Sequence, residues 1–199
     1  MELTDIGGLP AHPHIVHLPV VLVPLATVGA LLMLLRPSWR HTFAIPTAVL
    51  ATVAAIATQL AIGSGEALEE QVRESQLVET HSQIAEQARP FIFLFALVMI
   101  AVVVWDQVQR RQDRASSSLP GSEGGDAADP GGDTIVRTGV AVRSRATTVA
   151  VVLTAVGLLL GIASTVEVYR AGHSGAKATW HDVKPTSGDG DGDGDTDGD

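Results

Sequence analysis

Four long apolar blocks constrain the fold of this chain more than any other feature. They cover residues 18–35, 43–62, 91–105 and 147–166, and none contains Asp, Glu, Lys or Arg. Most approach the roughly 20 apolar residues that a helix needs to cross a bilayer core. The third block is shorter, but the chain before it has a helical pattern that extends it. The blocks predict an all-α polytopic membrane protein, a bundle of four transmembrane helices.

A soluble α-helical bundle is the alternative that the second block argues against. An amphipathic helix of such a bundle shows a polar residue every third or fourth position. Residues 44–62 contain only Thr and one Gln as polar side chains. The composition agrees, since 46% of the residues are hydrophobic and only 18% are charged. The apolar residues therefore face lipid rather than a small internal core.

Arginines between the apolar blocks predict the orientation of the chain in a plasma membrane. They follow the first and third blocks and precede the fourth, and positive residues mark cytoplasmic loops. Both termini and residues 63–89 are then extracellular. The first block is not a cleavable signal peptide, because no basic region precedes it and no cleavage site follows. The topology residues are Arg36, Arg40, His41, Arg110, Arg111, Arg114, Arg137, Arg143 and Arg145.

The charge of the chain is acidic and uneven. The formal net charge is −9, and six of the acids lie in the Asp/Gly tail that ends the chain. Many Asp and few Lys residues suit high salt, which screens repulsion between carboxylates, so we expect a halophilic archaeal source. Nucleic-acid binding is disfavoured because no basic stripe exists. The absence of Cys excludes disulfides, thiolate metal sites and a Cys nucleophile.

Low-complexity stretches divide the chain. Residues 1–114 carry the first three spans, and residues 135–181 carry the fourth helix, expected at about 147–169, with a His-Gly motif. Between them, residues 115–134 are rich in Ser, Gly, Pro and Asp and predict a disordered cytoplasmic linker. Residues 182–199 predict a disordered tail. The tail begins like a calcium loop, but the chain lacks the bidentate Glu that would close it.

Residues 64–89 predict an amphipathic exterior segment between spans two and three. One or two helices fit the pattern, with Ser64 as a candidate N-cap and Pro90 as a kink or restart. The apolar face carries His81, which is therefore expected to point toward the bundle or the membrane surface. That face consists of Leu77, His81, Ile84 and Ala88.

Histidines gather near the predicted outer face of the membrane. Of seven, only His41 lies elsewhere on this topology. Ionisable groups at such a depth are costly and usually functional. His14 and His17 share a face if Pro13 opens a helix. His173 lies between Gly172 and Gly175, two residues that let another segment approach closely.

Two interpretations of these histidines remain open. A single interfacial His is more often a hydrogen-bonding anchor than a ligand, and local sequence favours that role for His12 and His181. For the rest, convergence on a metal or haem competes evenly with anchoring. That group is His14, His17, His81 and His173.

Carboxylates accompany the histidines at the same face. Glu66 closely follows the second span, and it is the best candidate for a metal ligand or an acceptor that orients a His ring. The plainer alternatives are a helix N-terminal carboxylate for Glu66 and a solvated surface for Glu70. Glu167 lies near the outer end of the fourth span.

Gly157 and Gly161 form a GxxxG pattern in the fourth span. Such a pattern lets helices pack closely, within the bundle or between copies in an oligomer. It equally clears room for a flat porphyrin. Close packing is the commoner explanation.

Three stretches resemble one family of small membrane proteins. The stretches are "HPHIVHLPVVLVPLA", "GSGEALEE" with "VETHSQIAEQARP", and "YRAGHSGAKATW". They are similar to domain of unknown function 2231, a four-helix membrane family. The resemblance pairs His12 with His17 and leaves His14 in a variable slot. Positions that match the family pattern are His12, Pro13, Val16, His17, Pro19, Gly65, Glu66, His81, Gly172, His173, Gly175 and Trp180.

The resemblance adds a functional expectation. Some relatives carry a Rieske-type iron–sulfur domain on the same chain, which implies redox partners. The leading hypothesis is a membrane protein that binds b-type haem or a transition metal (Cu, Zn or Fe) in electron transfer. Candidate cofactor ligands are His12, His17, His81 and His173, and candidate metal ligands are His14, His17, Glu66, His81 and His173.

A non-enzymatic module is the competing hypothesis: a membrane scaffold, a pH or metal sensor, or a small permease-like subunit. The histidines would then anchor the protein or respond to pH. An enzyme with its own substrate is left open. No nucleophile–base pattern, phosphate loop or HExxH motif appears, so a zinc protease is disfavoured.

Overall fold

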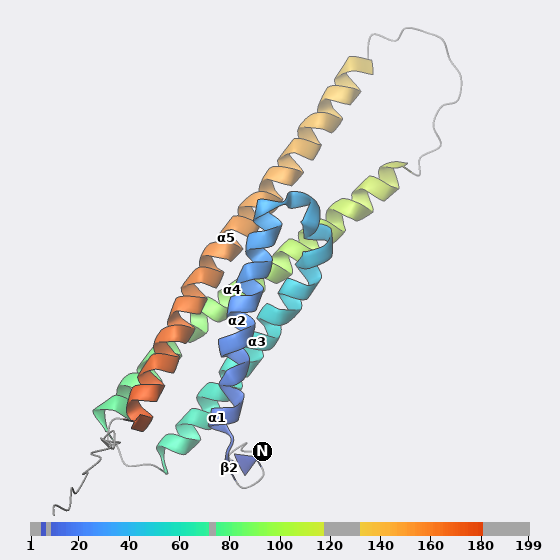
Figure 1. The fold of residues 1–199 in the computed structure, drawn as a ribbon. Helices are drawn as coiled ribbons and strands as arrows, with labels where there is room; N and C mark the ends of the chain where they lie inside the picture. Colours follow the sequence, from blue (N-terminus) through green and yellow to red (C-terminus); the bar gives the residue numbers. More distant parts are fainter. Residues whose placement is uncertain (1–4, 7–8, 72–74, 118–131, 181–199) are drawn as a thin grey trace, which may run out of the picture.

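The computed structural model describes residues 5–6, 9–71, 75–117 and 132–180, with side chains for residues 11–71, 75–115 and 146–180. A short antiparallel pair of strands near the N-terminus precedes a set of long helices (Figure 1). The elements are β1 (Asp5–Ile6), β2 (Leu9–Pro10), α1 (His12–Ile15), α2 (His17–Leu35), the 3₁₀ turn η1 (Pro37–Trp39), α3 (Arg40–Glu69), α4 (Gln76–Ser117) and α5 (Gly132–Trp180).

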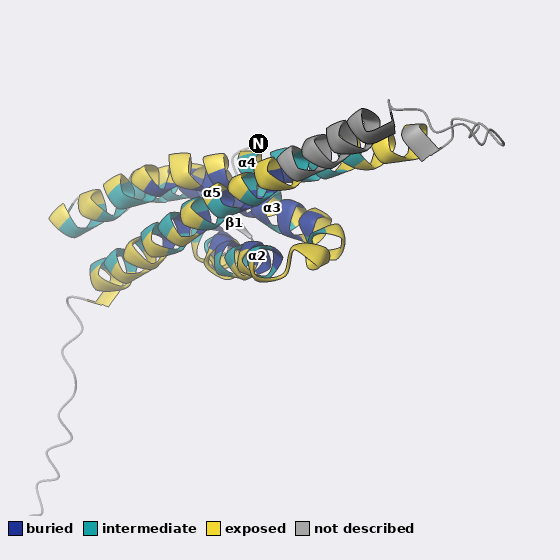
Figure 2. Ribbon diagram, turned by 90° about the horizontal axis from the view of Figure 1, so that it is seen from above, coloured by how far each residue is buried: buried dark blue, intermediate teal, exposed yellow. Residues whose placement is uncertain are grey.

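Four helical stretches are long and apolar enough to cross a membrane. They are His12–Leu35, Pro37–Glu69, Gln76–Ala115 and Ala146–Trp180. Many large apolar side chains on them are exposed, among them Leu159. Buried positions lie mainly on the inward faces and exposed positions on the outward faces (Figure 2). A soluble protein seldom exposes so much continuous apolar surface, so the predicted all-α membrane bundle is confirmed.

The segment between spans two and three differs from the prediction. Its described helical residues belong to the flanking helices: α3 runs on to Glu69, and α4 starts at Gln76 and passes through Pro90 without a break. Ser64 is not an N-cap: it lies inside α3, where its hydroxyl donates to the Ala61 carbonyl at 3.0 Å. Proline inside a helix removes only one backbone hydrogen bond, and membrane helices commonly tolerate this.

Helix α5 is longer than the expected span at both ends. Its 49 residues rise about 73 Å, more than twice the thickness of a bilayer core. Gly172, His173 and Gly175 therefore lie within this helix. The predicted linker 115–134 lies mostly outside the described residues, and so does the predicted tail 182–199.

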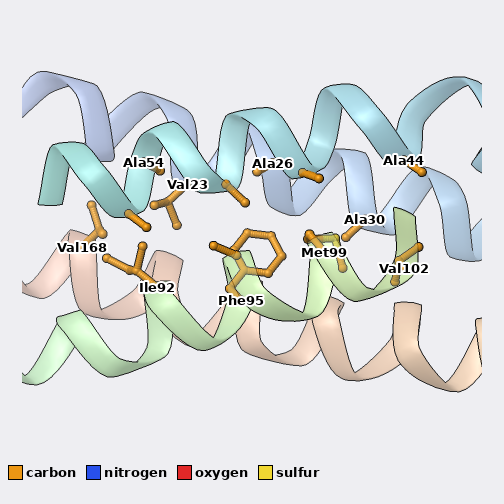
Figure 3. Packing of buried hydrophobic residues seen from close by; sticks show 14 of the residues in the cluster. Val23, Ala26, Ala30, Ala44, Ala54, Ile92, Phe95, Met99, Val102 and Val168 are labelled. Carbon is orange, nitrogen blue, oxygen red and sulfur yellow. The ribbon is translucent and has the colours of Figure 1, made fainter. Parts of the chain in front are cut away.

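The core lies where the four long helices face one another. Helix α4 packs along α5, and α2 packs against α3 and α5. Phe95 of α4 points into the middle of this core, among valines and alanines of its neighbours (Figure 3). In a bilayer no hydrophobic force drives helices together, so close van der Waals packing must hold them. Alanine is frequent in this core because its small side chain lets the helix backbones approach closely.

The GxxxG glycines belong to this core. A Cβ on Gly157 would collide with the Met99 side chain, and one on Gly161 would lie 3.1 Å from the Phe95 ring. Both glycines are buried inside the chain. The predicted oligomer face at Gly157 and Gly161 is therefore wrong, since this stripe is already covered, and Met99 and Phe95 fill the space considered for a porphyrin.

The two ends of the bundle differ in chemistry. At the arginine-rich end, Arg40 of α3 forms an ion pair with Asp106 of α4, and both side chains are largely buried. Beside it, Trp105 donates its indole N–H to the Ala146 carbonyl at 3.2 Å. The other end gathers α1, the end of α3, the start of α4 and the end of α5 (Figure 1). This second end carries most of the histidines.

Candidate functional site

A cavity of about 710 Å³ opens at the histidine-bearing end. Parts of α1, α2, α3, α4 and α5 line it, so it exists only in the folded bundle. Its larger apolar side chains include Val16, Pro19, Ile62, Val78, Ile92 and Val168. Small residues on the helices keep the space open, among them Ala61, Gly65, Ala85, Ala88, Ala171 and Gly175. The volume and the apolar lining are those of a pocket for an organic ligand or cofactor.

His12 forms part of the wall of this cavity, at the start of α1. Its Nδ1 lies 2.9 Å from the backbone carbonyl of Ala61, and the Ser64 hydroxyl is 3.4 Å away. A carbonyl oxygen only accepts, so the neutral ring carries its proton on Nδ1. The lone pair is then on Nε2. Gly65 makes room for the ring, because a Cβ there would lie 3.0 Å from His12 Cε1.

His81 of α4 also lines the cavity, as its place on the apolar face predicts. Its Nδ1 lies 3.1 Å from the Ser174 hydroxyl, which donates its own proton to the Ala171 carbonyl at 2.9 Å. The hydroxyl has only one proton, so it must accept from Nδ1–H of His81. The lone pair of this ring is also on Nε2. Gly175 passes close by, since a Cβ there would lie 3.0 Å from His81 Cε1.

The two rings lie within reach of one shared ligand. Their centroids are 6.2 Å apart and their planes are 80° from parallel. With metal–nitrogen bonds of about 2.0–2.1 Å, two imidazoles on opposite sides of one metal have centroids roughly 6–6.5 Å apart. His12 and His81 are therefore close enough that one ligand bound in the cavity could contact both rings.

Acidic groups edge the cavity. Glu66, Glu69 and Glu86 are among its lining residues, while the described lining includes no Lys or Arg. Glu69 is partly buried and close enough to His81 to interact with it electrostatically. Glu66, the carboxylate favoured from sequence, is exposed at the edge. The carboxylates make the mouth of the cavity more attractive to cations than to anions.

His17 and His173 do not join this pair. His17 is exposed, and its Nδ1 lies 2.6 Å from the Pro13 carbonyl in the preceding turn. His173 is exposed and stacks on Tyr169 of its own helix, with centroids 6.2 Å apart and planes at 6°. Neither residue lines the cavity. His17, which both the periodicity and the family pattern select, therefore lies outside this cavity.

The remaining candidates are dispersed. His14 is exposed on α1 and does not line the cavity. Glu70 is exposed, and Glu167 forms an ion pair with Arg170 at 2.8 Å on the same helix. His181 lies outside the described residues. Within the described part of the chain, no group of three or more His, Asp or Glu side chains is close enough to hold a metal ion.

Three groups of the site escape prediction from the sequence. Glu69 follows Glu66 by three residues, and this spacing places both on one face once the helix is known to continue past residue 62. The Ala61 carbonyl has no sequence signal at all. Ser174 adjoins the more conspicuous His173, but only the rotation of α5 decides which of the two faces the cavity.

The comparisons with known proteins identify one family. Residues 8–123, more than half of the chain, match the family described as "Predicted membrane protein (DUF2231)". The match includes His12 and His81 and ends before α5. No curated protein and no solved structure matches the chain. With its four apolar spans and its match over α1 to α4, the chain belongs to the DUF2231 family of predicted membrane proteins.

Proposed function

We propose that this integral membrane protein binds b-type haem through His12 and His81 and works in electron transfer. The observation that carries the proposal is the ring pair itself. The ring centroids of two imidazoles, each with its lone pair on Nε2, lie 6.2 Å apart in the wall of an apolar cavity of about 710 Å³. Bis-histidine ligation is a known way to hold a b-type haem without cysteine.

The number of ligands favours haem over a bare ion. A protein-bound zinc ion typically takes three or four protein ligands. The described residues bring only two imidazoles together, and no third ligand joins them within that part of the chain. Haem would bring most of the metal's ligands with it, so His12 and His81 alone would suffice to hold it.

The chain's own residues would hold and shield the group. The Ala61 carbonyl and the Ser174 hydroxyl orient the two rings. Apolar side chains such as Ile92 and Val168 keep water away from the interior of the cavity. Haem held there would supply one-electron redox chemistry. An apolar environment favours the state with the smaller net charge, so these walls help to set the reduction potential.

A bare transition-metal ion, such as Cu, Zn or Fe, is the second candidate. The acidic lining favours it, because Glu66 and Glu69 attract a cation and no described lining residue offers a positive charge to haem propionates. A modest movement of Glu69 toward His81 would add a carboxylate to the two imidazoles. Two His and one carboxylate form a common iron or zinc ligand set.

Spectroscopy of the purified protein tests the proposal. We expect a reduced-minus-oxidised absorption spectrum of a six-coordinate b-type haem, with about one iron per chain by metal analysis. Metal without a haem spectrum would replace haem by the bare-ion candidate. A colourless, metal-free and stable protein would contradict both and favour a scaffold, a sensor or a small permease-like subunit.

Histidine variants locate the ligands. His12→Ala and His81→Ala should each abolish or strongly reduce the haem spectrum, because each removes one axial bond. His17→Ala and His173→Ala are matched controls, since both side chains are exposed and lie outside the cavity. Loss of haem in the controls with retention in His12→Ala and His81→Ala would overturn the assignment.

The redox role rests on the family resemblance more than on geometry. Relatives with a Rieske-type domain suggest that a redox protein meets the outer face of the bundle. The pair of histidines at that face, near the membrane surface on the predicted topology, is suitably placed for such a partner. Reduction of the purified protein by a Rieske-type protein, followed as the change in haem absorption, tests this role.

A further inference from the structure

Ser174 lies beside the His81 ring, and Ser64 lies in a similar place beside the His12 ring. Each hydroxyl donates to an alanine carbonyl one turn earlier in its own helix, at 2.9 Å for Ser174 and 3.0 Å for Ser64. His12 donates Nδ1–H to a backbone carbonyl of α3, an acceptor that no side-chain substitution removes. His81 donates Nδ1–H to a side-chain hydroxyl on α5. The two imidazoles therefore differ in how close the serine is. The Ser174 hydroxyl lies 3.1 Å from Nδ1 of His81, whereas the Ser64 hydroxyl lies 3.4 Å from Nδ1 of His12, and the Ala61 carbonyl at 2.9 Å is the nearer acceptor there.

A second hydrogen bond determines whether the Ser174 hydroxyl donates to His81 or accepts from it. Its proton is donated to the Ala171 carbonyl one turn earlier, at 2.9 Å. A hydroxyl that donates elsewhere is left with lone pairs only, so it accepts from the ring nitrogen. The chain of bonds runs from His81 Nδ1 through Ser174 Oγ to the Ala171 carbonyl. The Ala171 carbonyl also interacts with the His81 ring directly. Ser174 and this carbonyl therefore both favour the proton on Nδ1 of His81.

The surroundings leave His81 little freedom to flip. The ring lies against Gly175, where even a Cβ would come within 3.0 Å of Cε1, and against the edge of His12. The orienting bond from Ser174 and the close approach at Gly175 come from the same turn of α5. This turn supplies both the room and the orientation for a residue on α4.

We propose that Ser174 is the positioning residue of this site: it holds His81 with the proton on Nδ1 and the lone pair on Nε2, and so tunes the bond from His81 to the bound cofactor. The part of this inference that concerns the cofactor rests on the function proposed above. The part that concerns the tautomer does not. Partners that orient a ligating histidine typically change metal affinity about 10- to 100-fold when they are removed.

Imidazole ¹⁵N NMR of the cofactor-free full chain in detergent tests the tautomer directly. In the wild type we expect Nδ1 of His81 to be protonated and Nε2 to be unprotonated. In Ser174→Ala the ring should become a mixture of tautomers, and Ser174→Thr, which restores a hydroxyl, should restore the wild-type signals. Identical His81 signals in the wild type and Ser174→Ala would overturn the proposal, whether or not the protein binds haem.

Cofactor binding is the second readout. Ser174→Ala should weaken haem binding about 10- to 100-fold and raise the reduction potential, since His81 loses the acceptor that makes it a stronger donor. Ser174→Thr should remain close to wild type in both. Ser82→Ala is the matched control, because Ser82 lines the same cavity but donates to the Glu79 carbonyl of its own helix. Equal effects of Ser174→Ala and Ser82→Ala would reduce the role of Ser174 to general packing.

Discussion

Two glycines leave the space that the imidazole rings of His12 and His81 occupy. Gly65 of α3 faces His12, and Gly175 of α5 faces His81. In each case a Cβ on the glycine would lie 3.0 Å from Cε1 of the imidazole ring. Both helices also carry a nearby glycine with open space around it: Gly63 in α3 and Gly172 in α5. Each helix therefore has one glycine that makes room for a ring and, within one turn, another glycine that contacts no side chain. Only the tertiary contacts distinguish the two.

Gly65→Ala should damage the site while Gly63→Ala should not. The new Cβ at residue 65 would lie 3.0 Å from His12 Cε1 and 3.1 Å from Nδ1, so the ring must move away from the Ala61 carbonyl. We expect a loss of about 1–3 kcal/mol in stability from overpacking. At residue 63 the change should instead stabilise the helix by roughly 0.5–1 kcal/mol.

Thermal unfolding and haem content of the two variants in the same detergent measure this difference. The stability comparison holds even for protein without cofactor, because the contact with His12 belongs to the chain. Equal stability of Gly65→Ala and Gly63→Ala would show that the His12 ring does not occupy this position.

At the scale of the elements, packing of α4 against α5 depends on a size match. Met99 of α4 fills the space that Gly157 of α5 leaves, and the Phe95 ring does the same at Gly161. Both aliphatic and aromatic partners are fully buried. In a bilayer the lipid tails are as apolar as the core, so close fit rather than water exclusion holds these helices together.

Gly157→Ala should destabilise the bundle by about 1–3 kcal/mol, since the Met99 side chain cannot share its position with a methyl group. Met99→Ala alone should also destabilise it, by about 2–5 kcal/mol, through an unfilled space. The double variant should lose less than the sum of the two, because each change relieves the other. Unfolding of all three in mixed micelles measures the coupling; strictly additive losses would contradict the contact.

At the scale of the whole molecule, the bundle has two chemically distinct ends. The turn between α2 and α3 lies at the arginine-rich end, near the ion pair of Arg40 and Asp106. The histidine cavity lies at the other end. This polarity agrees with the cytoplasmic assignment of the arginines, which remains a prediction from the positive-inside rule.

Single-cysteine labelling tests the orientation, because the natural chain has no cysteine to interfere. Gln71→Cys should react with a membrane-impermeant maleimide added to intact cells, while Ser38→Cys should react only after the membrane is permeabilised. Both positions are exposed at opposite ends of the bundle. Labelling of Ser38→Cys alone in intact cells would reverse the topology.

Much of the fold was predictable because it depends on local composition. Apolar blocks without charged residues predict membrane helices regardless of what these helices pack against. The four predicted spans are confirmed. Helix ends were not predictable. Nothing in residues 62–69 or at Pro90 stops a helix strongly enough, and in apolar surroundings the backbone gains from continuing its hydrogen bonds.

The site was predictable only in part. His81 shares a face with apolar neighbours, and this local periodicity correctly turns it inward. His12 followed from the family pattern alone. His17 and His173 looked equally suitable, but each residue of a helix is rotated by about 100° from the last. One step along α5 therefore exchanges the exposed His173 for the inward Ser174.

The sequence by itself determined that this chain is a four-span membrane protein with histidines concentrated at one end. Hydrophobicity and charge are properties of single residues that add up along a helix. They can therefore be read from the sequence without knowing how the helices pack. Only the tertiary structure decided that His12 and His81 meet, and that the Ala61 carbonyl, Ser174, Gly65 and Gly175 surround them. Those contacts join segments far apart in the chain. They depend on how each helix is rotated about its axis and how far it is shifted along the bundle.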